Sequence, residues 1–104
     1  MSKMNYNITN DKHVFYGRSV LQSIILLAVN EINGVIEVSN KDIKFDLFGD
    51  SVSVEVSVSV KYGHAAFDIA YRIQENIRSG VEVMTGYKVK NVDVYIKSVV
   101  LVEA

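Results

Sequence analysis

His64 and Asp68 stand four residues apart at the start of a predicted helix, a spacing that places two possible metal ligands on one helical face. A zinc site needs three or four ligands, and the only other histidine is His13. The chain has no cysteine, which removes thiolate catalysis, disulfides and cysteine-based metal sites. We therefore expect no metal: Asp68 favours the positive end of the helix, and His64 lies in a turn.

Neither the serines nor the glycines form a catalytic or phosphate-binding motif. Four serines alternate with valine or glutamate between residues 51 and 60, the pattern of a strand's polar face, and this pattern does not support a Ser-His-Asp triad. The six glycines stand singly and form neither G-x-x-G nor G-x-G-x-x-G, the motifs of RNA-clamping and nucleotide-binding loops. We expect no enzymatic activity, no cofactor and no small-molecule substrate.

The charge balance disfavours a general nucleic-acid binder. Eleven basic residues face twelve acidic ones in a chain of 104 residues, whereas binding to phosphates depends on an excess of lysine and arginine. The longest apolar run, residues 24–29, is far too short to cross a bilayer. Four tyrosines could stack on bases, although few cations accompany them: Tyr62, Tyr71, Tyr87 and Tyr95. A small nucleic-acid-binding or regulatory module is therefore kept as the alternative function.

Apolar spacing predicts the elements that position these residues. Residues 1–12 are polar and without periodicity, so they are expected to form a flexible N-terminal segment ahead of one domain spanning 13–104. A helix is predicted from Gly17 to about Asn33, where apolar residues recur every three or four positions. Two strands follow, the second with valine at every even position from 52 to 60.

A second helix is predicted from about residue 65 to residue 84, followed by a stop at Gly86 and a last strand around residues 92–96. The fold class is thus α+β, a small single domain of order α-β-β-α-β. Its three-stranded sheet is expected to be largely antiparallel, with both helices on one face. The buried stripe of the second helix is predicted to comprise Ala66, Ala70, Ile73, Ile77, Val81 and Met84.

Two groups of residues are candidates for an interaction surface. Gln74, Asn76 and Arg78 lie off the apolar stripe of the second helix and form either a solvated face or a partner-binding face. The second group is apolar on both sides of the last strand, and it either packs over the first helix or pairs with another subunit. It comprises Val99, Val100, Leu101 and Val102.

The stretch from Tyr62 to Ile96 resembles the alkaline-shock, or general-stress, family of Gram-positive-type bacteria. The resemblance lies in Tyr62-Gly63, the Ile-Gln-Glu-Asn-Ile run at 73–77, Met-Thr-Gly at 84–86 and the alternating strand at 92–96. Glu-Ile-Asn-Gly-Val at 31–35 is similar to the family's helix ending. The sequence departs from the family in having Gly-Arg rather than a Ser-Asp cap at 17–18, and Ala-Ala rather than a proline at 65–66. Both departures affect helix capping rather than chemistry.

The resemblance implies a non-enzymatic protein of envelope stress and cell-envelope homeostasis, acting as a self-associating scaffold or adaptor. The implied partners are further copies of the chain and a membrane-anchored relative. The implied location is the cytoplasm, at the inner face of the membrane when such a relative binds it.

Overall fold

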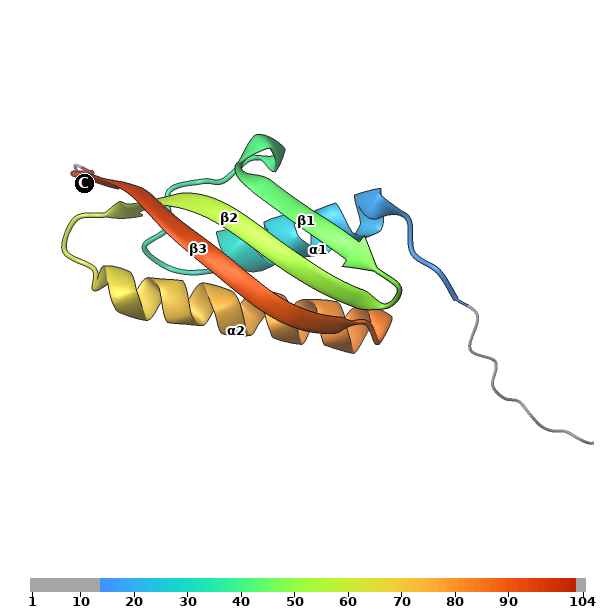
Figure 1. The fold of residues 1–104 in the computed structure, drawn as a ribbon. Helices are drawn as coiled ribbons and strands as arrows, with labels where there is room; N and C mark the ends of the chain where they lie inside the picture. The colour runs from blue at the N-terminus through green and yellow to red at the C-terminus, as the bar shows by residue number, and fades with distance from the viewer. Residues whose placement is uncertain (1–13, 103–104) are drawn as a thin grey trace, which may run out of the picture.

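The computed structural model describes residues 14–102 as a sheet with helices packed against it (Figure 1). The predicted flexible segment 1–12 lies outside the described residues. In chain order the elements are α1 (Arg18–Asn30), the short 3₁₀ helix η2 (Asn40–Asp42), β1 (Ile43–Phe48), β2 (Ser51–Lys61), α2 (Ala66–Thr85) and β3 (Lys88–Val100).

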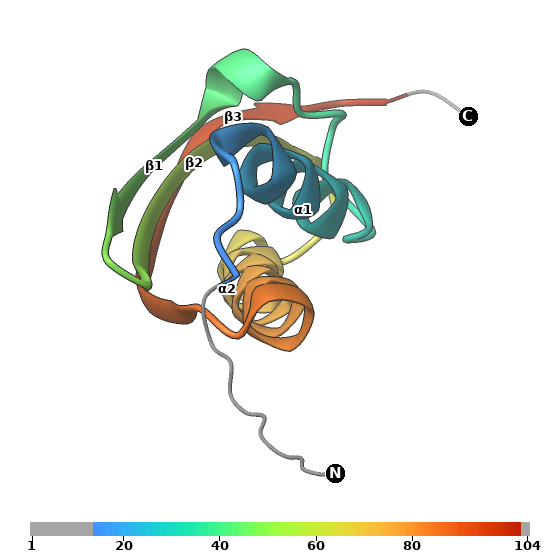
Figure 2. The same ribbon diagram turned by 90° about the vertical axis from the view of Figure 1, so that its right-hand side faces the viewer.

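Both helices cover the same face of the curved sheet, which confirms the predicted α+β class, element order and layering (Figure 2). The core forms between this face and the helices. The alternation in β2 sends its valines into that core while its serines and Glu55 face the other side. The core valines of β2 are Val52, Val54, Val56, Val58 and Val60, all almost fully buried.

The sheet has the order β1-β2-β3 and combines both kinds of pairing. The expected antiparallel pairing is found in the β1–β2 hairpin. The β2–β3 pair is parallel, because α2 carries the chain back along the sheet before β3 begins. At two places β3 has one residue more than the stretch of β2 that it pairs with, and one of these extra residues lies between Ile96 and Ser98.

Helix α2 buries a narrower stripe than the sequence predicts. Ile69, Ile73, Ile77 and Val81 face the core at a regular four-residue spacing. The prediction that Met84 is buried is wrong: its side chain is 66% exposed, because it lies off the line of the four core residues. Ala66 and Ala70 are half-buried at its margin. Gly86 ends the helix in the left-handed conformation, as predicted.

The turn after α1 packs closely on the start of α2. Helix α1 ends at Asn30, before the predicted Asn33-Gly34 stop, and a turn leads to Gly34 with φ of +97°. A Cβ at Gly34 would lie 2.8 Å from side-chain atoms of both His64 and Ile69. Position 34 therefore requires glycine for its backbone conformation and for space.

Candidate interaction surfaces

The outer edge of β3 is the long free edge of the sheet. At the opposite side of β2, the segment after α1 pairs with the strand's end: Ile36 N–H donates to the Ser59 carbonyl, and Lys61 N–H donates to the Gly34 carbonyl. β3 has a strand partner on one side only. Edge strands leave N–H and C=O groups that must be covered or used.

Two side chains of α2 cover the first half of this edge. Glu82 accepts a hydrogen bond from Val89 N–H at 3.0 Å, and Gln74 donates one to the Val92 carbonyl at 3.0 Å. Gln74 therefore ties the helix to the sheet and also closes part of the edge to other strands. Whether Gln74 contacts a partner as well stays a prediction.

The second half of the edge is open. The N–H and C=O groups of successive residues in a strand point to opposite edges, so those of every second residue point to the same edge. Val92 presents its carbonyl to Gln74 at the outer side, and the register is regular from Val92 to Ile96, so Val94 and Ile96 also present their backbone groups outward. Within residues 14–102 no partner is seen for these groups. We call residues 93–97 the open edge.

The C-terminal end of β3 extends past the helix that covers it. At 1.5 Å per residue the 20 residues of α2 span about 30 Å, whereas the 13 residues of β3 span about 43 Å. The excess corresponds to about four residues. The last two residues of β3 and the two that follow the strand do not pack over α1, and they form an exposed apolar overhang: Val99, Val100, Leu101 and Val102.

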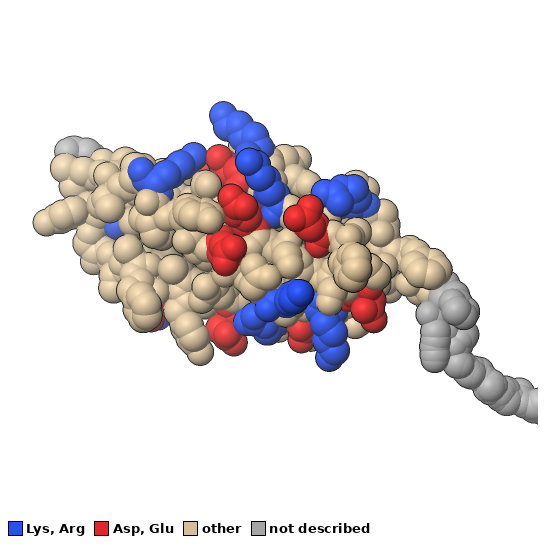
Figure 3. All heavy atoms as spheres, in the orientation of Figure 1, with Lys and Arg blue, Asp and Glu red and all other residues tan. Residues whose placement is uncertain are grey.

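Exposed aromatic side chains accompany the open edge and the overhang. Phe67 and Tyr71 lie on the helical stripe that continues to Gln74, and Phe67 is 88% exposed. Tyr62 follows the end of β2 and is exposed as well. Figure 3 shows charges of both signs over the middle of the sheet face, whereas the end of the molecule where β3 finishes is mostly uncharged. Phe67 was not predicted as a surface residue, although its four-residue spacing to Tyr71 is visible in the sequence.

Asn76 and Arg78, the other predicted surface residues of α2, have partners within the chain. The Asn76 side-chain amide donates to the Ala28 carbonyl at 2.7 Å and to the Glu31 carboxylate at 2.9 Å. Arg78 forms an exposed ion pair with Glu75 at 3.6 Å. Asn76 thus joins α2 to the end of α1. A role of either residue in binding a partner stays a prediction.

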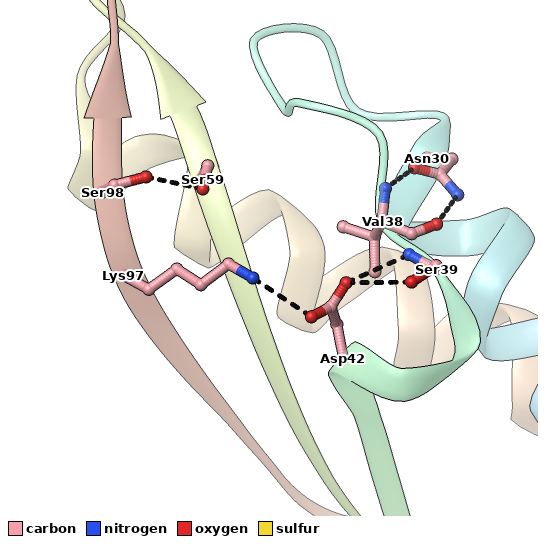
Figure 4. Close-up of polar contacts among 7 residues, drawn as sticks. All are labelled: Asn30, Val38, Ser39, Asp42, Ser59, Lys97 and Ser98. Atoms are coloured by element: carbon pink, nitrogen blue, oxygen red, sulfur yellow. Dashed lines mark hydrogen bonds and ion pairs between the residues drawn. The ribbon is translucent and has the colours of Figure 1, made fainter.

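A cluster on the polar face of the sheet connects β3 to the segment before β1 (Figure 4). Lys97 Nζ lies 3.1 Å from Asp42 Oδ1, and the other oxygen of Asp42 accepts from the Ser39 N–H and hydroxyl. Hydrogen bonding from the Ser39 N–H, followed by Lys97, holds the pKa of Asp42 below its usual value. The Ser59 and Ser98 hydroxyls share a hydrogen bond of 2.7 Å.

An apolar groove of about 590 Å³ lies between α1 and α2, on the side away from the sheet. Val20, Leu27 and Met84 contribute exposed apolar side chains to it, and Glu31 is the one ionisable residue among the described residues that line it. The sequence signal for this groove was the surplus of apolar residues around α1. Such a groove can contact an apolar surface, but it does not present converging catalytic groups.

As predicted, His64 lies in the turn before α2, and Asp68 lies in the first turn of that helix. Asp68 pairs with Arg72 at 3.1 Å, one helical turn away. Among residues 14–102 no three His, Cys, Asp or Glu side chains come together as metal ligands. In the same part of the chain no helix is long and apolar enough to cross a membrane.

A family model described as having a cell envelope-related function, that of alkaline shock protein 23, matches residues 37–101, more than half of the chain. The chain belongs to this family. The match begins ahead of β1 and ends within the overhang, so it includes the whole sheet and α2. It confirms the resemblance seen in the sequence.

One relative and a group of solved structures add to this assignment. An uncharacterized protein of Bacillus subtilis (strain 168), YqhY, is 26% identical over 90% of this chain and 82% of its own length. A structure of the MamM CTD is 16% identical, with a TM-score of 0.57 over 79% of this chain and 98% of that one. A copper form of a MamM CTD variant matches with the same values. At this identity the likeness shows a shared fold alone.

Proposed function

We propose that the chain is a non-enzymatic scaffold or adaptor of the cell envelope that works by associating with further copies of itself. The observation that carries the proposal is the second half of β3, where an unpaired strand edge and exposed apolar side chains coincide. Edges and apolar patches of this kind on a folded domain mark interfaces. The family's envelope-related description supports the setting.

The proposal also includes a role in envelope stress. It places the protein in the cytoplasm, with a partner that is anchored in the membrane. The sheet face carries cations and anions side by side, rather than the basic patch that attracts a protein to anionic lipid (Figure 3). In this proposal, attachment to the membrane comes from a partner that carries its own anchor. The groove between α1 and α2 is a second surface, separate from the β3 edge, and leaves room for a partner while copies associate.

The nucleic-acid alternative is less well supported. Tyr95 lies on the polar face of the sheet, but its neighbours in the sheet include Asp93 and Glu55 as well as Lys97. Carboxylates beside the aromatic ring repel a phosphate backbone. An apolar interface also differs in its response to salt, since phosphate binding weakens steeply with ionic strength and apolar burial does not.

Light scattering during size exclusion tests the proposal. The monomer mass is 11.6 kDa, and we expect a dimer or larger species whose proportion rises with protein concentration and persists at high salt. A fluorescence titration with single-stranded RNA, at low and high salt, tests the nucleic-acid-binding alternative. A monomer at every concentration would contradict the self-association. Salt-sensitive RNA binding by such a monomer would favour the alternative.

A further inference from the structure

Asp93 and Lys97 carry opposite charges at the two ends of the open edge, each two residues from Tyr95. Both side chains are exposed on the polar side of the sheet. Lys97 contacts Asp42, whereas Asp93 meets only the Asn91 amide, at 3.5 Å, and pairs with no cation among residues 14–102. When two copies of this edge face each other in opposite directions, the negative end of one therefore meets the positive end of the other.

We propose that two copies of the chain pair β3 with β3 in antiparallel orientation across the open edge, with Tyr95 at the two-fold axis. The two three-stranded sheets then become one six-stranded sheet. This inference rests on the proposed self-association and specifies its geometry. A two-fold pairing uses the same surface of both copies and closes after two subunits.

The backbone groups of the open edge suit this register. With Tyr95 facing itself, Val94 lies opposite Ile96 of the partner subunit, and the symmetric pair repeats this contact. Val94 and Ile96 both present their N–H and C=O groups outward, so each pair exchanges two hydrogen bonds and the dimer gains four. Their side chains lie on the helix-covered face, alongside Val56 and Val58 of β2, and meet as apolar pairs.

The charges suit the same register. Asp93 lies opposite the partner's Lys97, and Lys97 lies opposite the partner's Asp93, on the polar face. Directly opposite side chains in an antiparallel pair are close enough to interact. The Lys97 side chain is 51% exposed, and its long flexible stem can rotate from Asp42 to the partner's carboxylate.

The exposed aromatic side chains of α2 lie close to the proposed two-fold axis at Tyr95. Gln74 touches Val92, and from there Tyr71 and Phe67 lie about 4.5 Å and 10.5 Å along the helix, while Tyr95 lies about 10 Å along the strand. Phe67 therefore lies at about the level of the axis and Tyr71 about one helical turn before it, both on the helix side of the sheet. The partner brings its own pair from the opposite direction, which explains why these large apolar side chains remain exposed in one copy.

Neighbouring registers fit less well. An axis at Val94 would require the edge groups of Val92, whose carbonyl is already bound by Gln74. An axis at Ile96 would oppose Val94 to Ser98, which faces the polar side because of the inserted residue at the second register shift. Only the axis at Tyr95 joins free backbone groups, apolar pairs and opposite charges.

Charge reversal tests this register on the full chain. Asp93→Lys and Lys97→Glu each place like charges opposite one another twice per dimer, so each variant alone should dimerise on the order of ten-fold more weakly, or worse. An equimolar mixture places opposite charges together again, and should recover the dimer mass as a heterodimer. The readout is molar mass by light scattering, with circular dichroism to verify that each variant folds.

Two control variants distinguish the open edge from an interface elsewhere on the chain. Asp42→Asn removes the same internal ion pair as Lys97→Glu but retains Lys97, and should remain dimeric. A chain ending at Ser98 lacks the overhang but retains the open edge, and should still dimerise.

Dimers that tolerate both charge reversals would overturn the register while leaving self-association intact. Loss of the dimer on truncation alone would place the interface in the overhang instead. A wild-type monomer at all concentrations would overturn both the register and the proposed self-association.

Discussion

Replacing Asn76 by alanine should destabilise the domain measurably, although the sequence predicts for it only a solvated face or a partner-binding face of α2. Its amide donates to the Ala28 carbonyl at 2.7 Å and to Glu31 at 2.9 Å. Ala28 is in the last turn of α1, where carbonyls have no partner within the helix. The neighbouring carbonyls of Leu27 and Val29 are satisfied by the turn after the helix, so Asn76 supplies the missing donor.

The magnitude follows from these contacts. Loss of a hydrogen bond to a half-buried carbonyl, together with a weaker one to a carboxylate, costs about 1–2 kcal/mol. For a domain of this length that corresponds to a fall in Tm of about 5–15 °C. Asn76→Asp should cost more, about 2–3 kcal/mol, because it places a carboxylate against two acceptors.

Thermal and urea unfolding followed by circular dichroism measure both variants. Glu75→Ala is the matched control on the same turn of α2, since it removes only an exposed ion pair worth about 0.5 kcal/mol or less. If Asn76→Ala and Glu75→Ala shift the unfolding midpoint equally, Asn76 is an ordinary surface residue and the capping argument is wrong.

Three further outcomes are expected. Gly34→Ala should lower the free energy of unfolding in urea by about 2–4 kcal/mol, because the position has a positive φ and a Cβ there would meet side-chain atoms at 2.8 Å. Gly49→Ala should lower it by only about 1 kcal/mol, because Gly49 has φ of +65° but open space around it. Equal losses would refute the packing argument. The pKa of Asp42 is lowered in the folded state, so its carboxylate stabilises the fold above the ordinary value near 3.8, and this contribution is lost as pH falls through the folded value. Urea unfolding from pH 7 downward should therefore show a shallower acid loss of stability in Asp42→Asn than in the wild type, and identical profiles would contradict the shift. The purified chain should not sediment with vesicles of phosphatidylglycerol and phosphatidylethanolamine, and direct binding would contradict attachment through a partner.

Periodicity was sufficient to predict most of the fold. The valines at even positions of β2 and the three-to-four-residue spacing of the helices depend on local geometry, so the elements and the helix-covered face follow from sequence. The parallel β2–β3 pair requires knowing how α2 carries the chain between the strands. The exposure of Met84 depends on which line of α2 meets the core, a choice made by the packing of two helices.

The candidate surfaces were only partly predictable. The apolar residues 99–102 are visible in the sequence, and their exposure follows once β3 is known to be longer than α2. The roles of Gln74 and Asn76 were not visible, because an amide on a helix looks the same whether it faces water or a carbonyl. The division of β3 into a capped half and an open half depends on the strand order and on two side-chain contacts, neither of which a single sequence records.

Residue-resolved amide hydrogen exchange at low and high protein concentration tests the central claim, self-association through the open edge, most directly. The N–H of Val89 is bonded to Glu82 within one copy and should be protected to the same degree at both concentrations. The N–H groups of Val94 and Ile96 should exchange quickly at low concentration and become protected at high concentration, as β3 pairs with β3. If their exchange does not change while the molar mass rises, the chain associates through a different surface and the open edge is not the interface.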